Sequence, residues 1–308
     1  MKMEKWKILF LRTYKLFHQL FHRSYGEILM LHRVVEERSL LENNRNLEIT
    51  PAFLEQTILK YKTAGYCFVS LDEVQQQVES RKRGRHKFVC FTLDDGYADN
   101  YEQAYPVFKK YDCPFAIYVS TDFPDKKAQL WWYHLQDVVL GNEKLTLNGV
   151  EYDCSDLKKK NQAFMELRKK VFTLDVGKTL KSLEQLFIEN NYVARRDMNA
   201  LTLSWEQIAE LAADPLCTIG AHTISHVALS GLSDEMIRKE LLGGKIRIED
   251  RIKKPVKHFS YPYGFWNNRV AHLAMEQFST AVLAGPDGLV RKGDSLDRLN
   301  RINLIEKP

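Results

Sequence analysis

The amino-acid sequence predicts an α/β fold in which a parallel sheet closes into a barrel. Three observations indicate this class. Short β-forming runs alternate with helical patterns along the 308 residues. The run from Phe88 to Leu93 is apolar at almost every position, as expected when helices cover one face of a strand and a barrel interior the other. Barrels of alternating strands and helices also reach this length as one folding unit.

Eight runs are predicted strands: residues 28–31, 67–71, 88–93, 115–120, 218–221, 258–261, 280–284 and 302–305. A helix is expected to start at Thr50-Pro51, where an N-cap residue precedes a proline at the first helical position, and to end at Gly65. Residues 124–203 interrupt the alternation and are predicted to form a helical insertion. Within it, Asn148-Gly149 is typical of a tight hairpin over residues 145–152.

The predicted domains are a barrel over residues 25–308 and an amphipathic helical segment over residues 1–24. Apolar residues recur near a helical period in this segment, and lysines are available to meet anionic headgroups. Amphipathicity alone fits both peripheral membrane contact and packing on the barrel. Arg12 and Lys15 break the apolar stretch, and no small-residue cleavage site follows. No clear signal peptide or transmembrane helix is therefore predicted, and the expected location is cytoplasmic or peripheral to the membrane.

Composition and cysteine usage exclude several protein classes. Hydrophobic residues at 44% and charged residues at 28% are ordinary globular values, which excludes intrinsic disorder and a multi-span membrane protein. The net charge of +5 is interspersed along the chain, so a nucleic-acid partner is not expected. The five cysteines are odd in number and form no CxxC pair, so we interpret them as reduced core thiols. They are Cys67, Cys90, Cys113, Cys154 and Cys217.

The first chemical signal is Thr92-Leu93-Asp94-Asp95-Gly96, where a buried strand ends in two carboxylates and a glycine. Two aspartates inside a continuing strand would bury one unpaired charge, at a cost of several kcal/mol. At the C-terminal mouth of a barrel strand, both carboxylates are able to reach one cleft, where such folds place their chemistry. The alternative is a helix cap.

The second signal is the pair His222 and His226, at positions i and i+4 after the predicted strand 218–221. This spacing lets both imidazoles face one side and suits a metal such as zinc, which takes two histidines and one carboxylate in many catalytic sites. Asp95 is the expected third ligand. Histidines at this spacing also occur by chance in ordinary helices.

The third signal is Phe259-Ser260-Tyr261-Pro262-Tyr263-Gly264, at the end of another predicted strand. With this motif the chain resembles the polysaccharide deacetylases of carbohydrate esterase family 4, which carry the NodB homology domain. TLDDG, HTISH and SYPYG match the family's three motifs in order. The resemblance implies a distorted barrel of about seven strands that holds one divalent metal, usually Zn²⁺.

The chain departs from the family's motif pattern at two places, and both departures resemble one branch of the family. The third motif normally carries an arginine at the position of Ser260, and the C-terminal Leu-x-His motif is absent. His32 ends an N-terminal strand, which resembles the circularly permuted branch that includes poly-N-acetylglucosamine deacetylases. This resemblance implies that His32 is the general acid and that Arg301 supplies the missing guanidinium. For His32 the alternative is a core or capping histidine.

The expected function is metal-dependent hydrolysis of N-acetyl groups on the amino sugars of an acetylated polysaccharide or glycan. Asp94 would act as the base, kept ionised beside the cation, and His32 as an acid kept charged by nearby carboxylate. Family resemblance implies that the Tyr263 N–H binds the oxyanion and that Tyr261, Pro262 and Tyr263 contact substrate. The alternatives are an amidase or O-acetyl esterase of the same fold, and a non-catalytic glycan-binding barrel.

One aromatic pair in the predicted insertion has two interpretations. Trp131 and Trp132 are able to stack on sugar rings, but aromatic residues in helices more often belong to a core. The core interpretation is therefore the expected one.

Overall fold

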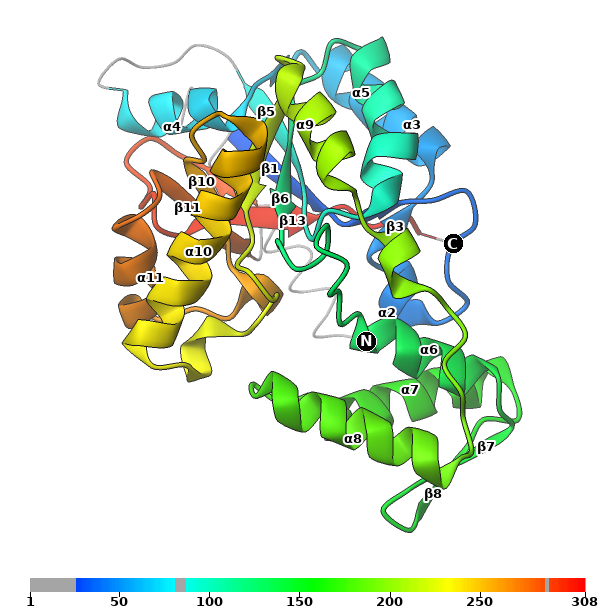
Figure 1. The fold of residues 1–308 in the computed structure, drawn as a ribbon. Coiled ribbons are helices and arrows are strands. Elements are labelled where there is room, and N and C mark those ends of the chain that lie inside the picture. The colour runs from blue at the N-terminus through cyan, green and yellow to red at the C-terminus, as the bar shows by residue number, and fades with distance from the viewer. Residues whose placement is uncertain (1–25, 81–86, 286–287, 308) are drawn as a thin grey trace, which may run out of the picture.

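A computed structural model describes residues 26–80, 87–285 and 288–307 (Figure 1). Seven parallel strands form a closed barrel, because the first of them pairs with β5 on one side and with β13 on the other. The strands, in barrel order, are β1 (Gly26–Leu31), β5 (Phe88–Leu93), β6 (Phe115–Val119), β9 (Cys217–Ala221), β10 (His258–Ser260), β11 (Thr280–Ala284) and β13 (Leu299–Asn303). The predicted α/β barrel of about seven strands is confirmed.

Apolar side chains cover both faces of the barrel strands. On β5, Val89, Phe91 and Leu93 belong to the large cluster that packs against the outer helices. Cys90 of the same strand belongs to a second cluster together with Tyr118 of β6. Because successive strand residues point to opposite faces, these two clusters lie on the outside and inside of the barrel wall. This explains why the run from Phe88 to Leu93 is apolar throughout.

The helices of the barrel surround this wall in Figure 1. They are α2 (Glu42–Arg45), α3 (Pro51–Thr63), α4 (Leu71–Glu79), α5 (Tyr105–Lys110), α9 (Trp205–Ala213), α10 (Asp234–Ile252) and α11 (Asn268–Met275). Shorter turns are the π-helix η1 (Asn100–Ala104) and the 3₁₀ segments η2 (Met198–Leu201), η3 (Leu229–Gly231) and η4 (Pro262–Gly264).

The start of α3 follows from its capping residues, as predicted. Thr50 accepts a hydrogen bond from the Phe53 N–H, and Pro51 takes the first helical position. Gly65 adopts a left-handed φ of 72° just after the helix, and the Tyr66 N–H reaches back to the Tyr61 carbonyl oxygen. This C-terminal arrangement is the one that glycine allows without strain.

Two predicted strands differ from those observed. Only Cys67–Phe68 pairs, as β4, because Ser70 and Glu73 form a capping box that starts α4. The last barrel strand is Leu299–Asn303 rather than 302–305, because Arg301 faces the barrel interior inside an alternating segment. The remaining strands outside the barrel are β2 (Arg33–Val34), β3 (Glu48–Ile49), β7 (Lys144–Leu147), β8 (Val150–Asp153) and β12 (Leu289–Val290).

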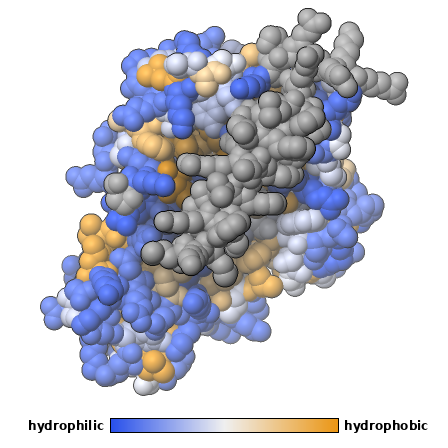
Figure 2. Space-filling model, turned by 180° about the vertical axis from the view of Figure 1, so that it is seen from behind, coloured by the Kyte–Doolittle hydropathy of each residue, from blue (hydrophilic) through white to orange (hydrophobic). Residues whose placement is uncertain are grey.

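The segment between β6 and α9 forms a lobe below the barrel in Figure 1. It contains α6 (Trp131–Leu140), the predicted hairpin as β7 and β8, α7 (Leu157–Val171) and α8 (Val176–Glu189). These elements share their own apolar cluster, separate from the barrel clusters. Figure 2, which shows the molecule from behind, gives the surface of this lobe as mostly hydrophilic. We call these elements the helical lobe.

Two sequence predictions concern membrane contact and thiols. The amphipathic segment 1–24 lies outside the described residues, so its prediction stays untested. Within the described residues, each helix is either too short or too polar to cross a membrane. All five cysteines are free, and four are buried. The prediction of core thiols is wrong for Cys67, which is exposed on the short strand β4.

Candidate active site

The two carboxylates of the first motif follow β5 at the C-terminal mouth of the barrel. The Asp94 N–H donates to the Leu31 carbonyl oxygen at 3.0 Å and so extends the pairing of β5 with β1. Asp95 and Gly96 then take left-handed φ values of 77° and 82°, which turn the chain sharply. The side chains of Asp94 and Asp95, both 4% exposed, line the same cavity. The structure thus places both carboxylates at one cleft rather than at a helix cap.

Arg301 lies inside the barrel and binds Asp94 with both of its terminal nitrogens. Nη1 donates to Oδ1 at 2.7 Å, and Nη2 donates to Oδ2 at 2.6 Å. Nη2 also donates to the Ser260 hydroxyl at 2.9 Å, and this hydroxyl donates to Asp94 Oδ2 at 3.2 Å. Ser260 therefore stands where the resemblance expects an arginine, and the guanidinium arrives from β13 to contact both residues.

The Arg301 guanidinium controls the charge of Asp94. Burial acts to raise the pKa of Asp94, but the charge and hydrogen bonds of Arg301 outweigh burial and hold this pKa below its usual value. Asp94 is therefore ionised at neutral pH. A carboxylate offers about four acceptor sites. Arg301 and Ser260 use three of them, and one is left for a group in the cavity.

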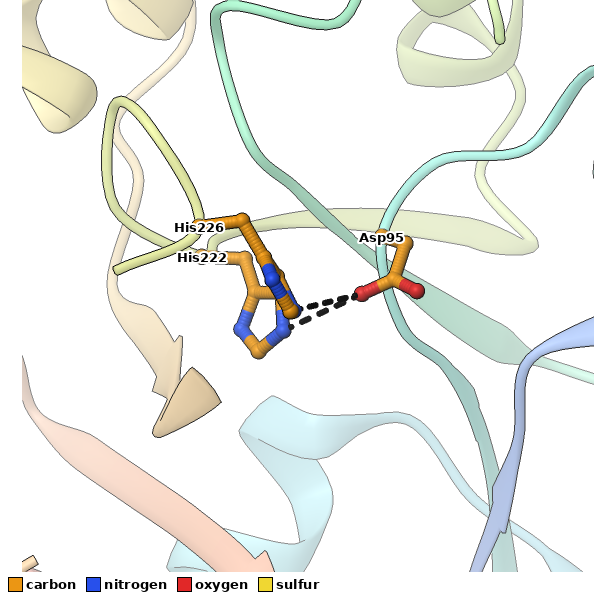
Figure 3. A group of neighbouring side chains, drawn as sticks. All are labelled: Asp95, His222 and His226. Atoms are coloured by element: carbon orange, nitrogen blue, oxygen red, sulfur yellow. Dashed lines mark ion pairs between the residues drawn. The ribbon is translucent and has the colours of Figure 1, made fainter. Parts of the chain in front are cut away.

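The two histidines of the second motif approach Asp95 from the segment after β9, as Figure 3 shows. Their Nε2 atoms lie 3.3 Å (His222) and 3.1 Å (His226) from Asp95 Oδ1. The convergence does not come from helical spacing. His222 directly follows the strand, and Thr223 and His226 adopt left-handed φ values of 68° and 54°, so the intervening chain is a tight loop.

Helix α10 holds this loop in place. The carboxylate of Glu240 accepts hydrogen bonds from the N–H groups of Ile224 and Ser225 at 2.9 and 3.0 Å. A Cβ atom on Gly244 would lie 3.1 Å from the Thr223 backbone, so glycine lets the helix approach closely. The sequence prediction missed Glu240 and Gly244. A glycine pair inside a charged helix was the available signal.

The atoms around Asp95 fit a bound cation. His222 Nδ1 lies 2.7 Å from the Ser260 carbonyl oxygen, which only accepts, so Nδ1 carries the hydrogen. In the neutral imidazole, Nε2 then presents a lone pair toward Asp95 Oδ1. This oxygen is buried without a hydrogen-bond partner among the described residues. Two facing acceptors repel unless a positive charge lies between them, and one ligand atom from each of Asp95, His222 and His226 lies within 4.8 Å of the others.

His32 follows β1 and lines the same cavity as Asp94. Its Nδ1 has no hydrogen-bond partner among the described residues. Burial lowers the pKa of His32 and outweighs the opposing effect of Asp95 and Asp94. The expectation that nearby carboxylate keeps His32 charged is therefore wrong for the protein without a ligand, because the cost of burying the charged ring exceeds the attraction of the two carboxylates.

The three residues predicted to contact substrate differ in whether they line the cavity. Tyr263 lines the cavity with a left-handed φ of 59°, and its ring lies 4.6 Å from that of His226. Tyr261 also contributes to the wall, but it is 1% exposed and its hydroxyl donates to the Asp297 carbonyl oxygen. Pro262 is buried and lies outside the cavity lining.

The helical lobe supplies one wall of the cavity, whose volume is about 280 Å³. The indole N–H of Trp131 donates to the Tyr263 hydroxyl at 3.3 Å, and that of Trp132 donates to the Tyr97 hydroxyl at 3.1 Å. Trp131 is only 3% exposed, so it both packs in a core and borders the cavity. The sequence prediction also missed Arg168 of this wall, because no local sequence signal indicates that α7 lies beside the barrel motifs.

Known proteins resemble this chain in sequence. A model of the polysaccharide deacetylase family matches residues 81–280, which is more than half of the chain. The chain is 20% identical over 277 residues to a Bacillus subtilis (strain 168) protein named "Putative polysaccharide deacetylase YxkH". The match covers 90% of this chain and 70% of that protein.

Solved structures share the fold. The Streptococcus pyogenes deacetylase PplD, in complex with acetate, has a TM-score of 0.63 at 20% identity, and the match covers 91% of this chain and 92% of that one. IcaB from Ammonifex degensii has a TM-score of 0.59 at 19% identity, with 92% and 93% covered. Together with the family match and the three motifs around one cavity, these findings show that the chain belongs to the polysaccharide deacetylase family.

Proposed function

We propose that the chain is a metal-dependent hydrolase that removes N-acetyl groups from the amino sugars of a polysaccharide. The observation that carries the proposal is the convergence of Asp95, His222 and His226, whose ligand atoms lie within 4.8 Å of one another. Asp94 and His32 line the same cavity. A base, an acid and a cation site in one cavity are what amide hydrolysis requires.

The three ligands suit one divalent cation, and Zn²⁺ best matches two imidazoles and one carboxylate. When bound, such a cation lowers the pKa of a water molecule from about 16 toward about 7 and polarises a carbonyl group. The residues around the ligands fix their orientation. The Ser260 carbonyl oxygen holds His222 in one tautomer, and the Tyr263 and Trp132 rings pack against His226 at 4.6 and 5.4 Å.

Asp94 is the proposed base. Its carboxylate is kept ionised by Arg301 and retains one acceptor site toward the cavity, so it is able to take a proton from the attacking water. Arg301 and Ser260 act as positioning residues, since their hydrogen bonds fix the carboxylate plane. The family resemblance assigns the Tyr263 N–H to the oxyanion that develops on the acetyl group.

His32 is the proposed acid. An amine leaves slowly unless it is protonated, so a group on the cavity wall has to deliver a proton to the nitrogen. His32 is the histidine of the cavity that stands apart from the three ligands, and its Nδ1 has no partner in the described part of the chain. The acid function requires the imidazolium form, which the burial of His32 disfavours.

Metal content and acetate release together test the proposal. We expect purified protein to bind one Zn²⁺ and to release acetate from N-acetylglucosamine oligomers. We also expect a chelator to abolish activity and added Zn²⁺ to restore it. The His226→Ala variant should lose both metal and activity. His272→Ala is the matched control, because this side chain is 80% exposed on α11.

Two outcomes would replace the proposal. Hydrolysis of a small amide or an O-acetyl ester by zinc-loaded protein, without acetate release from glycans, would favour an amidase or esterase of the same fold. Glycan binding without turnover of any substrate would favour a non-catalytic barrel.

A further inference from the structure

The cavity wall contains a cationic side chain, Arg168, to which the reaction described above assigns no function. Arg168 lies in the last turn of α7, in the helical lobe, and is half-buried. It lines the same cavity as Asp94 and His32. Its guanidinium carbon lies 5.8 Å from the centre of the Trp131 ring and 5.9 Å from that of Phe172. The aromatic rings therefore hold the guanidinium group at the cavity wall.

Within the part of the chain that the structure describes, Arg168 differs from Arg301 and Arg33 because it lacks an acidic partner. Arg301 binds Asp94, and Arg33 binds Asp99 at 2.7 Å. Across residues 26–80, 87–285 and 288–307, no carboxylate lies within ion-pair distance of Arg168. Burial lowers the pKa of Arg168, but an arginine remains protonated at neutral pH. The cavity wall thus carries a positive charge that no described side chain compensates.

A neutral N-acetylated sugar such as N-acetylglucosamine has no charge to meet this guanidinium. We propose that Arg168 binds an oxyanion carried by the glycan, a carboxylate or a phosphate on a sugar next to the N-acetylated one, so that the substrate is an acidic polysaccharide. This inference rests on the proposed function and adds a substrate class to it. A guanidinium offers five N–H donors in a planar fork that matches both oxyanions.

Partial burial strengthens such a contact. Arg168 is half-buried beside Trp131 and Phe172, and charge-assisted hydrogen bonds gain strength where water is partly excluded. The alternative is that Arg168 only packs its aliphatic stem on these rings, as long cationic side chains commonly do. The two roles differ in one measurable respect, because packing alone gives no preference for a charged substrate.

The test compares neutral and acidic oligosaccharides. The neutral probe is an N-acetylglucosamine oligomer. The two acidic probes are an oligomer of alternating N-acetylglucosamine and glucuronate, and an N-acetylglucosamine oligomer with a phosphate on the neighbouring sugar. Zinc-loaded wild type, Arg168→Gln and Lys169→Gln are each assayed for acetate release and, by calorimetry, for binding. Lys169 is the matched control, because it is exposed on the same helical turn and carries the same charge.

We expect wild type and Lys169→Gln to bind one acidic probe about tenfold or more tightly than the neutral probe, as charge-assisted hydrogen bonds imply. Arg168→Gln should lose this preference while its binding of the neutral probe stays unchanged. The acidic probe with the larger preference identifies the oxyanion. The inference would be overturned if wild type bound all probes equally. It would also be overturned if Arg168→Gln lost the same affinity for neutral and acidic probes. Failure of wild type to release acetate from any probe would instead overturn the proposed function.

Discussion

Two arginine–aspartate pairs, whose aspartates lie five residues apart in the chain, differ in how the arginine is used. Arg301 gives both terminal nitrogens to Asp94, one to each carboxylate oxygen. Arg33 donates to Asp99 through Nε at 2.7 Å. Its Nη1 donates to the Tyr133 hydroxyl at 3.2 Å and lies 3.9 Å from Glu48 Oε1. The guanidinium of Arg301 therefore contacts one carboxylate, whereas that of Arg33 is shared between two carboxylates and a hydroxyl.

This difference has opposite consequences for the two aspartates. Burial acts to raise both pKa values, yet the pKa of Asp94 is lowered by Arg301 while the pKa of Asp99 remains raised. The pKa of Glu48, which shares Arg33, is also raised by burial. Burial therefore does not decide the charge of a carboxylate by itself. An arginine opposes burial at both aspartates, and it prevails at Asp94, which receives two donors from one guanidinium.

The two pairs also differ in what they connect. Asp94 faces the cavity, next to the proposed metal ligands. Arg33 instead joins the barrel to the helical lobe, because Tyr133 belongs to α6 and the guanidinium lies 5.1 Å and 5.3 Å from the Tyr97 and Tyr133 rings. We therefore assign a chemical role to the first pair and a structural role to the second, and four predictions test this division.

The largest effect is expected from amide substitution of the two aspartates. Asp94→Asn removes the proposed base and should lower kcat for acetate release by about 10²- to 10⁴-fold. It should retain the metal, because Asp95 and the two histidines are unchanged. Asp99→Asn should keep most of the activity but unfold at lower temperature. Zinc content and circular dichroism serve as controls for both variants. If the two variants lose comparable activity, the Asp94 pair and the Asp99 pair do not differ in role.

A smaller effect is expected at His32, which lines the cavity and precedes Arg33 in the chain. His32→Ala should slow amide hydrolysis by about 10²-fold, because general-acid catalysis contributes at least this much. An acetyl ester with a good leaving group needs no acid, so its hydrolysis should change little. In wild type, the acid is lost as pH rises through the lowered pKa of His32, so amide turnover should decline on the alkaline side. Equal amide activity of wild type and His32→Ala would refute the acid role.

Substitution of the two arginines should affect stability in both cases but catalysis in only one. Arg301→Met and Arg33→Met each leave a buried carboxylate without its cation, so both should lose about 3 to 5 kcal/mol of unfolding free energy in urea. Only Arg301→Met should change the pH profile of kcat. Without the guanidinium, burial raises the pKa of Asp94, and activity should be lost at a higher pH on the acid side. An unchanged acid limb would show that Arg301 does not control Asp94.

The smallest effect is expected from Tyr133→Phe. This change removes a hydroxyl that accepts from Arg33 but leaves the ring in place. We expect a loss of about 1 kcal/mol in thermal or urea unfolding and little change in kcat. A large fall in kcat would mean that the contact between α6 and the barrel also positions Trp131 and Trp132 at the cavity.

Much of the fold was predictable because its signals are local. Thr50-Pro51 starts α3, and Asn148-Gly149 lies at the turn of the β7–β8 hairpin. The strand β5 is recognisable from its apolar run alone. Local signals failed at Cys67, where a capping box ended the strand early, and at the last barrel strand, where Arg301 is hidden within an alternating segment. The capping box is itself a local signal that competes with the β pattern, whereas the position of Arg301 inside the barrel is a tertiary requirement.

The three motifs and His32, which together give the proposed base, ligands and acid, are visible in the sequence because each one follows or ends a strand of a parallel barrel. Chain topology alone brings such ends to one mouth. Three features depend on packing between elements far apart in the chain: the contact of the helical lobe with the cavity, the loop geometry that Glu240 supports, and the lack of an acidic partner for Arg168 among the described residues. Only the tertiary structure decided these features, because side-chain burial, pairing and pKa values are set by neighbours in space and not by neighbours in sequence.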